Sequence, residues 1–256
     1  MAVLPAALTT SGYTLSIADD PGHVVAAQRL RHEVFATELG ATLRPGADGL
    51  DVDDFDPHCD HLIVRQHRDA AVVGTYRLLP PGRVQRRYAD GEFDLAALDP
   101  LRDDLVEAGR SCVHPEHRTG AVITLMWVGI TRYLHLRGSR WLGGCASVPV
   151  ADGGRAAAEV WALARARHLA PPPLRVRPLR PWFAEPGVPL AATAVGGTVA
   201  RALLPPLLRG YLRLGAWVCG EPAYDPDFGV VDFYLLFSLD RMNPRYLRHF
   251  LGGVQR

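Results

Sequence analysis

Aspartates crowd one short segment of the chain, and they are the first side chains that could hold a substrate. Phe55 interrupts the run as an apolar anchor would, and the last aspartate comes where the segment enters an apolar stretch. A carboxylate-rich pocket beside a strand would suit a cationic amine, while a solvated acidic turn explains the same composition equally well. The run contains Asp51, Asp53, Asp54, Asp56 and Asp60.

A single arginine, Arg77, lies inside the otherwise apolar residues 72–79. Burying a guanidinium costs free energy unless it is paired. We therefore expect this side chain either to bind a substrate anion or to pair with a carboxylate of the acidic run.

Residues 107–113 (EAGRSCV) combine a carboxylate, a guanidinium and a thiol in one predicted strand. The turn at 118–120 follows and opens a long predicted helix. Free backbone N–H groups and the helix dipole make such a helix N-terminus an anion site. The sequence thus predicts a buried glutamate, Glu107, followed by an anion-binding turn.

Two other chemistries compete for these residues. His58, Cys59, Asp60 and His61 are four consecutive possible metal ligands, but neighbouring residues of a strand point to opposite faces. No second cluster has the spacing of a zinc site, so we expect no metal. Cys112 could be a nucleophile activated by His114 or His117, although a buried, inert thiol is the favoured interpretation.

Composition removes several classes of function. Lys+Arg 28 against Asp+Glu 27 leaves a net charge of +1, which gives no global attraction to nucleic acid. No lysine occurs, so Schiff-base chemistry is excluded. The four cysteines are widely spaced, as in reduced proteins. No apolar run could span a bilayer and MAVLPAALTT lacks the charges of a secretory signal, so we expect a cytoplasmic protein.

The apolar periodicity predicts the elements that hold these side chains. Their order indicates an α/β (α+β) fold with a mixed sheet flanked by helices. Composition changes near residue 150, which suggests a core over 12–150 and a C-terminal extension over 151–256 that returns one strand. Strands are predicted at 13–17, 61–65, 71–79, 105–113, 141–148 and 230–239, and helices at 23–39, 121–136 and 156–168.

Two levels of family resemblance are present. The succession Arg31, Val34, Phe35, then Asp53, Phe55, Asp56, then Gly74, Arg77, Leu78, then Glu107 and Arg110 resembles the signature of acyl-homoserine-lactone synthases. Those enzymes have the GCN5-related N-acyltransferase (GNAT) fold. The longer strings CDHLIV, GTYRL, GRSCV, GGCAS, LLRGYLRLGA and GEPAYDPDFGVVDF resemble ornithine-lipid N-acyltransferases over nearly the whole chain from about residue 13.

This resemblance implies transfer of a (3-hydroxy) fatty-acyl group from acyl carrier protein to the α-amine of an amino acid, with ornithine expected, to form lyso-ornithine lipid. No tightly bound cofactor is implied; acyl-phosphopantetheine or acyl-CoA is the co-substrate. The superfamily's phosphate-binding pattern is degenerate here, since only Gly120 is recognisable, and this favours carrier protein. Two alternatives stay open: an enzyme like the acyl-homoserine-lactone synthases, which are shorter, and a non-catalytic acyl-carrier or lipid-binding module.

The resemblance also suggests roles for the site residues. Glu107 would be the general base, and backbone N–H groups near Cys112 and Val113 would bind the oxyanion. The leucine- and arginine-rich residues 199–215 either pack on the core or touch the inner membrane. Substrate-binding roles are expected for Arg31, Asp53, Asp56, Asp60, Arg77 and Arg110, and donor-binding roles for Val113, Arg118, Thr119, Gly120 and Ala121.

Overall fold

The computed structural model describes residues 7–43, 49–182 and 204–252. Contacts between Cα atoms divide these residues into two compact units. The first unit contains the described residues up to 84, together with 104–140 and 244–252; the second contains 85–103 and the described residues of 141–243. The chain therefore passes back and forth between the units, and the predicted core of 12–150 stays a prediction.

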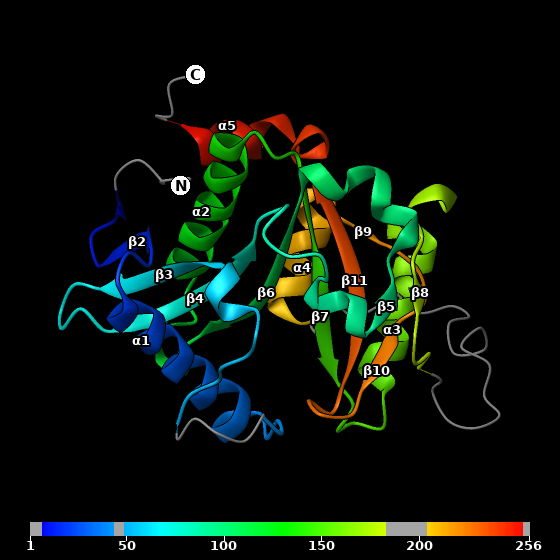
Figure 1. The fold of residues 1–256 in the computed structure, drawn as a ribbon, viewed down its shortest axis with the longest axis horizontal. Helices are drawn as coiled ribbons and strands as arrows, with labels where there is room; N and C mark the ends of the chain where they lie inside the picture. Colours follow the sequence, from blue (N-terminus) through cyan, green and yellow to red (C-terminus); the bar gives the residue numbers. More distant parts are fainter. Residues whose placement is uncertain (1–6, 44–48, 183–203, 253–256) are drawn as a thin grey trace. The chain divides into compact units, whose positions relative to one another are not determined.

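The first unit is built on an antiparallel sheet in the order β1-β2-β3-β4-β6 (Figure 1). Its apolar strands are buried on both faces, because helices cover them. The strands are β1 (Leu8–Thr9), β2 (Tyr13–Ile17), β3 (Asp60–Gln66), β4 (Val72–Leu79) and β6 (Leu105–Val113).

Helices α1 (Pro21–His32) and α2 (Gly120–Arg137) cover opposite faces of this sheet. Gly74 faces α2, since a Cβ there would meet Met126 and Val122. The neighbouring Thr75 points to the other face, where its strand partner Cys112 packs with Leu30 of α1. A π-helix, η1 (Glu33–Glu38), continues α1, and α5 (Pro244–Leu251) packs against α2.

Strand β6 carries a bulge in its middle. Thr75 pairs with Cys112 and Arg77 pairs with Gly109, so two steps along β4 match three steps along β6. The extra residue of a bulge falls out of the ladder and bends the strand. Arg110 lies inside this bulge with φ +51°, a left-handed conformation that is uncommon for a residue other than glycine.

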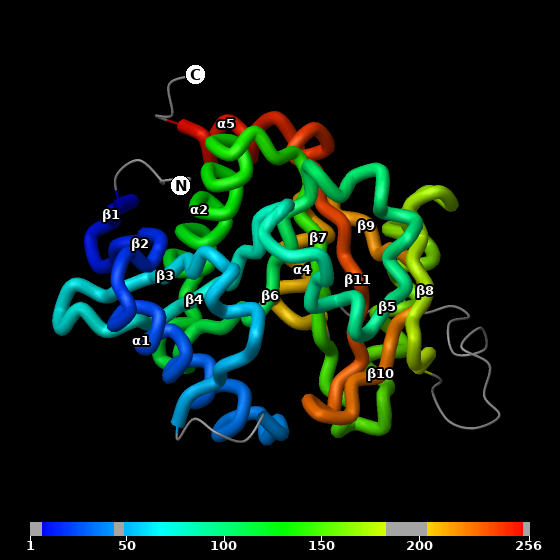
Figure 2. The backbone as a smooth tube through the Cα atoms, viewed as in Figure 1, coloured from blue at the N-terminus to red at the C-terminus, as the bar shows by residue number. Residues whose placement is uncertain are grey.

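In the second unit, β11 (Val230–Ser238) pairs antiparallel with three strands and is buried along its whole length (Figure 2). Its partners are β7 (Trp141–Pro149), β9 (Trp217–Val218) and β10 (Ala223–Asp225). A separate pair joins β5 (Phe93–Asp94) to β8 (Arg177–Pro178). The helices are α3 (Arg155–Leu163), the π-helix η6 (Ala164–His168) and α4 (Pro206–Leu214).

The predicted class, a mixed α/β fold with helices around a sheet, is confirmed. Each strong apolar pattern matches an observed strand or helix within a few residues. In the leucine- and arginine-rich segment 199–215, α4 begins at Pro206, since proline is tolerated in a first turn. Residues 199–203 lie outside the described part. Six short elements carried no pattern in the sequence: β1, β5, β8, β9, β10 and α5. The same holds for the 3-10 turns Asp56–His58, Pro115–His117, Pro172–Leu174 and Leu239–Arg241.

None of the helices in the described residues has both the length and the apolar character needed to cross a membrane.

Candidate active site

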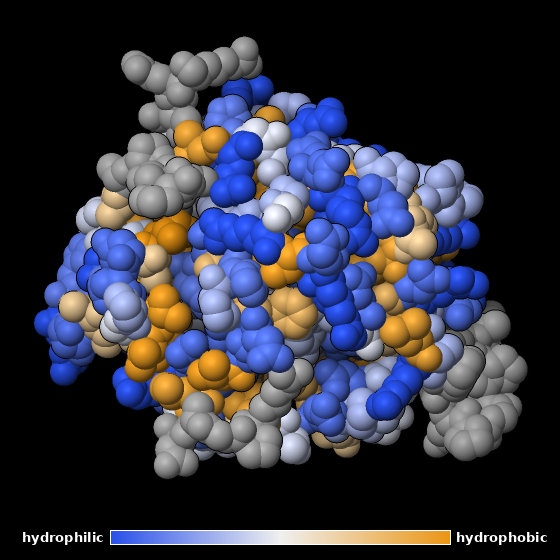
Figure 3. Space-filling view, viewed as in Figure 1, coloured by the Kyte–Doolittle hydropathy of each residue, from blue (hydrophilic) through white to orange (hydrophobic). Residues whose placement is uncertain are grey.

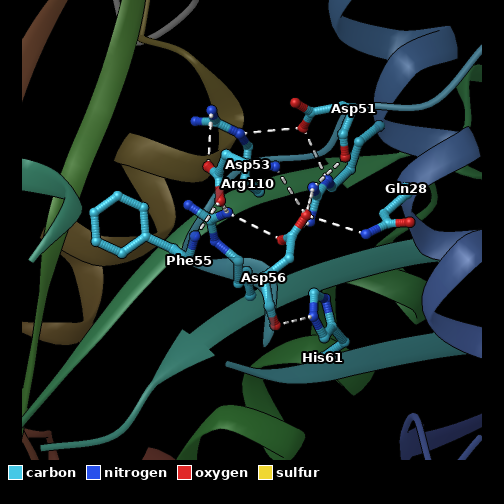
Figure 4. A network of polar contacts seen from close by, with 9 residues as sticks. Gln28, Asp51, Asp53, Phe55, Asp56, His61 and Arg110 are labelled. Carbon is cyan, nitrogen blue, oxygen red and sulfur yellow. Dashed lines mark hydrogen bonds and ion pairs between the residues drawn. The ribbon is translucent and has the colours of Figure 1, made fainter. Parts of the chain in front are cut away.

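Three arginines and three aspartates form one continuous network in the first unit (Figure 4). The arginines come from three elements, α1, β4 and β6, whereas the aspartates all come from the short segment before β3. We call this set the arginine–aspartate network; it comprises Arg31, Arg77, Arg110, Asp51, Asp53 and Asp56.

Arg31 is the most deeply buried member, with no exposed surface. Its Nε donates to Asp51 at 2.8 Å, and its two terminal nitrogens donate to the two carboxylate oxygens of Asp56 at 2.9 and 2.8 Å. One of them also donates to the backbone carbonyl of Asp51. Because its donors are all directed at this segment, Arg31 ties the acidic segment to α1.

Arg77 and Arg110 connect the same segment to the sheet. Arg77 Nη1 donates to Asp53 at 2.6 Å and to Asp56 at 3.0 Å. Arg110 Nε donates to Asp51 at 3.1 Å, and its Nη2 lies 3.4 Å from Asp53. The side chain of Arg110 is 12% exposed, more than any other in the network. Of the six, it is the one that offers surface to a ligand.

Three further side chains hold the aspartates in position. Gln28, one turn before Arg31 on α1, donates to Asp56 at 3.1 Å, and its backbone carbonyl accepts from the Asp51 N–H. His61 Nε2 lies 3.2 Å from the backbone carbonyl of Asp56. The Arg77 guanidinium lies 5.9 Å from the centre of the Phe55 ring.

Neighbouring guanidinium groups lower the pKa values of Asp53 and Asp56. Burial disfavours the charged form of Asp53, but the Arg77 and Arg110 guanidinium groups outweigh it and lower the pKa. Burial likewise opposes ionisation of Asp56, yet Arg31 and Arg77 bring its pKa well below the usual range. Three guanidinium groups therefore face three carboxylates, and the sum of charges is zero.

This neutrality bears on the predicted roles of the six residues. A carboxylate already shared by two guanidinium groups attracts an additional ammonium weakly. Arg31, Asp53, Asp56 and Arg77 are thus arranged to hold one another and to fix Arg110. Direct contact of these four with a substrate stays a prediction.

Asp60 lies apart from the network. Its carboxylate accepts from Tyr133 of α2 at 2.6 Å and pairs with Arg83 at 2.9 Å. Arg83 also donates to the His58 carbonyl. These contacts join the start of β3 to α2, and the substrate-binding role of Asp60 stays a prediction.

Glu107 is 5% exposed and lies opposite Leu79 in the β4–β6 ladder, three residues before Arg110. The charges of this region act on the thiol of Cys59. Burial raises the pKa of the Cys59 thiol to about 12; Arg77 opposes this shift, while Asp56, Asp53 and Glu107 add to it. Glu107 is therefore a buried carboxylate on β6, the strand that also carries Arg110.

The thiol of Cys112 is fully enclosed, and burial raises its pKa far above the usual range. A nucleophile needs its thiolate, so the structure favours the inert interpretation of this side chain. The backbone of Cys112 pairs with Thr75 and follows the bulge directly, since the regular pairing of β6 with β4 is interrupted between Gly109 and Cys112.

The turn before α2 has free space in front of it. Thr119 occupies the N-cap without a side-chain hydrogen bond, no acidic residue lies in the first turn, and a Cβ on Gly120 would meet nothing within 4 Å. Arg118 donates to the Val113 carbonyl at 3.1 Å and pairs with both oxygens of Glu38 at 2.7 and 2.5 Å. The positive end of the helix dipole and the exposed Arg118 therefore lie next to each other, an arrangement that suits the binding of an anion.

The sequence analysis considered residues 58–61 as possible metal ligands and expected no metal there. In the described residues, groups of possible ligands whose atoms lie within 4.8 Å occur around His114, His23 and Glu92. The run of residues 58–61 supplies none of these groups.

The sequence analysis omitted Asp51, Gln28 and His61 from the site. Asp51 belonged to the same acidic run and could have been included on that ground. Gln28 could have been found from its position one helical turn before Arg31. His61 carried no signal that separates it from an ordinary core histidine.

Comparisons with known proteins show the family of the chain. The chain is 35% identical to an L-ornithine N(alpha)-acyltransferase of Rhodobacter capsulatus over 95% of this chain and 96% of the relative. It is 32% identical to the enzyme of the same name from Brucella abortus over 94% of this chain and 89% of the relative. A family model described as "Acetyltransferase (GNAT) domain" matches residues 30–128.

Solved structures agree on the fold. A CoA-dependent acyl-homoserine lactone synthase, BjaI, aligns with a TM-score of 0.51 at 17% identity, covering 90% of this chain and 81% of that one. FeeM, an N-acyl amino acid synthase from uncultured soil microbes, aligns with a TM-score of 0.51 at 10% identity, covering 89% and 92%. At these identities the likeness concerns the fold alone.

Proposed function

Because the chain belongs to the family of L-ornithine N(alpha)-acyltransferases and has the GNAT fold, we propose that it acylates the α-amine of ornithine in ornithine-lipid biosynthesis. The observation that carries this proposal is 35% identity over almost the full length of a curated relative. The product is a lyso-aminolipid, and the acyl group is a 3-hydroxy fatty acid delivered as a thioester of acyl carrier protein.

The reaction forms one C–N bond and breaks one C–S bond. The neutral amine adds to the thioester carbonyl, the resulting oxyanion collapses, and the thiolate leaves and takes up a proton. An α-amino group has a reference pKa of about 7.7–8.0, against about 10.4 for a lysine-like side-chain amine. Deprotonation at Nα is therefore easier near neutral pH, which favours acylation there.

Glu107 is the proposed general base for this deprotonation, directly or through one water. Its side chain is buried on β6, close to the network that holds Arg110. A positioned base of this kind contributes about 10²–10⁴-fold in rate.

The β6 bulge is the proposed source of the oxyanion donors. A regular ladder uses the backbone N–H groups of a strand in pairing, whereas a bulge leaves a residue out of it. Here Arg110 and Ser111 lie outside the register, and we propose that backbone N–H groups beside them, near Cys112 and Val113, donate to the substrate oxygen. Donors that are fixed before the reaction need no reorganisation when charge develops.

Arg110 is the proposed contact for the carboxylate of the amino acid. Its side chain has the greatest exposure in the network, and Asp51 and Asp53 fix its direction. A guanidinium can bind a carboxylate with two parallel hydrogen bonds. Arg31, Arg77, Asp53 and Asp56 then act by positioning Arg110.

The N-terminus of α2 is the proposed site for the phosphate of the donor. Backbone N–H groups of Gly120 and Ala121, together with Arg118, would bind it. Glu38 neutralises Arg118 in the free protein. Phosphopantetheine on a carrier protein has one phosphate. It needs fewer hydrogen-bond donors from this turn than the pyrophosphate of coenzyme A.

Mass spectrometry tests the reaction. Purified protein is incubated with 3-hydroxyacyl carrier protein and a pool of amino acids, and lipids are extracted. An amide of ornithine is the expected product, and a parallel reaction with the coenzyme A thioester identifies the donor. An amide of another amino acid would overturn the acceptor, and a lactone or no product would overturn the proposed reaction.

A further inference from the structure

The second unit contains a stretch of sequence in which arginines and apolar residues occur together without an acidic residue. Residues 160–182 contain no aspartate or glutamate, although the whole chain is almost neutral. The arginines in this stretch are exposed. We call this the arginine surface; its cations are Arg165, Arg167, Arg175, Arg177 and Arg180.

Backbone contacts bring the two halves of this stretch together. Leu169 forms a bridge with Val218, and the Val176 N–H donates to the carbonyl of Cys219 at 2.6 Å. Arg175 Nε donates to the Ala170 carbonyl at 2.9 Å. The prolines between residues 170 and 175 therefore form a closed turn, and the arginines on both sides of it belong to one region of the second unit.

Large apolar side chains project from the same region. Leu179, between Arg177 and Arg180, is 56% exposed, and Tyr224 is 40% exposed. The Tyr224 N–H donates to the Arg180 carbonyl at 2.9 Å, so the two residues are neighbours. In Figure 3, hydrophilic atoms gather along the edge that carries β5 and β8, with hydrophobic atoms among them.

The side chains of these arginines stay exposed where they make contacts within the protein. Arg177 pairs with Asp94 at 2.6 Å, and its side chain is still 83% exposed. Arg165 lies 5.6 Å from the ring centre of Trp161, a contact that leaves its charge intact.

We propose that the arginine surface docks the protein on a membrane that contains anionic lipids. Arginines attract the phosphates of such a surface, while an exposed leucine and a tyrosine suit the boundary between headgroups and acyl chains. An acidic protein partner would need the cations but not an apolar side chain exposed between them. Docking would hold the protein at the bilayer into which a single-chain lipid product partitions.

This region differs from the one considered from sequence. Residues 199–215 were expected either to pack on the core or to touch the membrane, and in α4, which lies in the described part of that segment, Leu208, Tyr211, Leu212 and Leu214 are buried. The apolar face of α4 is thus used in packing.

Vesicle sedimentation tests the proposal without any measurement of activity. The full-length protein is mixed with vesicles of phosphatidylcholine containing phosphatidylglycerol, and with phosphatidylcholine alone. Binding is expected only to the anionic vesicles and should weaken as salt is added. Each arginine near such a surface contributes about 1 kcal/mol, or about fivefold in partitioning.

The triple variant Arg165→Gln, Arg167→Gln, Arg180→Gln should therefore bind roughly a hundredfold more weakly. Leu179→Ser should reduce binding at high salt more than at low salt. The control is Arg29→Gln, Arg68→Gln, Arg248→Gln, which removes the same charge from exposed positions of the first unit; it should bind nearly as wild type does.

Equal losses in the test and control variants would reduce the effect to net charge and overturn the proposal. Unchanged vesicle binding, combined with a higher KM for acyl carrier protein, would instead make the arginine surface a protein dock. Because acylation in solution is assayed separately, failure of docking and failure of the proposed reaction are distinguishable.

Discussion

Replacing Asp56 by asparagine should cost more stability than any change to an exposed acid of this protein. Asp56 accepts hydrogen bonds from Arg31, Arg77 and Gln28, and its side chain is about 4% exposed. Asparagine keeps one acceptor oxygen and removes the charge. Two buried guanidinium groups then share two carboxylates with Arg110, and one positive charge is left without compensation.

The expected magnitude follows from that charge. Removing one partner of a buried ion pair costs about 3–5 kcal/mol, a large part of the 5–15 kcal/mol typical of whole proteins. Unfolding in urea, followed by the fluorescence of the five tryptophans, measures the change in midpoint. Asp99→Asn is the control: it breaks the exposed pair with Arg102, which should contribute no more than about 1 kcal/mol.

Asp56→Asn should also change how the free energy of unfolding depends on pH below about pH 4. The pKa values of Asp53 and Asp56 in the fold lie below the reference value of 3.8. Their ion pairs therefore contribute stability that is fully present above about pH 4 and is lost as the pH falls through the lower, folded-state values. Wild type should lose stability steeply below pH 4, and Asp56→Asn less steeply. A loss no larger than that of Asp99→Asn at neutral pH, with an unchanged acid limb, would refute the network as the structural centre of the site.

Three further changes probe the chemistry. Glu107→Gln should lower kcat by about 10²–10⁴-fold with little change in the KM for the donor, and near-normal turnover by folded protein would eliminate the general base. Glycine suits the left-handed backbone at φ +51°, so Arg110→Gly should fold although it removes the guanidinium. It should raise the KM for ornithine and leave the KM for the donor unchanged. If the KM values of both substrates rise equally, Arg110 does not bind the amino acid. Glu38→Gln should free Arg118 and improve donor binding by up to about fivefold. Titration calorimetry with acyl carrier protein measures this change. Weaker binding would mean that the ion pair supports the turn.

Periodicity in the sequence was sufficient for the long elements of the fold. The strand patterns at 13–17 and 105–113 coincide with β2 and β6, since alternating or continuous apolar runs have few other solutions in a sheet. The π-helix after His32 escaped prediction because the same residues also satisfy an α-helical pattern. Two-residue strands such as β5 depend on a distant partner rather than on their own composition.

The candidate site shows where sequence reasoning stops. An arginine in an apolar strand and a run of aspartates implied that the two would pair, and Arg77 does pair with Asp53 and Asp56. Which aspartates join was not predictable: Asp51 enters the network, while Asp60 turns to Tyr133. That choice depends on the fold of the segment between α1 and β3. The bulge at Arg110 was equally hidden, since it arises from a mismatch between two strands and not from a glycine.

The interleaving of the two units also has a consequence for biosynthesis. Helix α5 packs on α2, and Arg132 of α2 donates to the Phe250 carbonyl at 3.1 Å. About a hundred residues of the second unit separate these helices in the chain. At roughly 5–20 residues per second, a ribosome needs several seconds between making α2 and releasing α5. During that interval the nascent first unit exposes the surface of α2 that α5 later covers, and this is the stage at which a chaperone would bind.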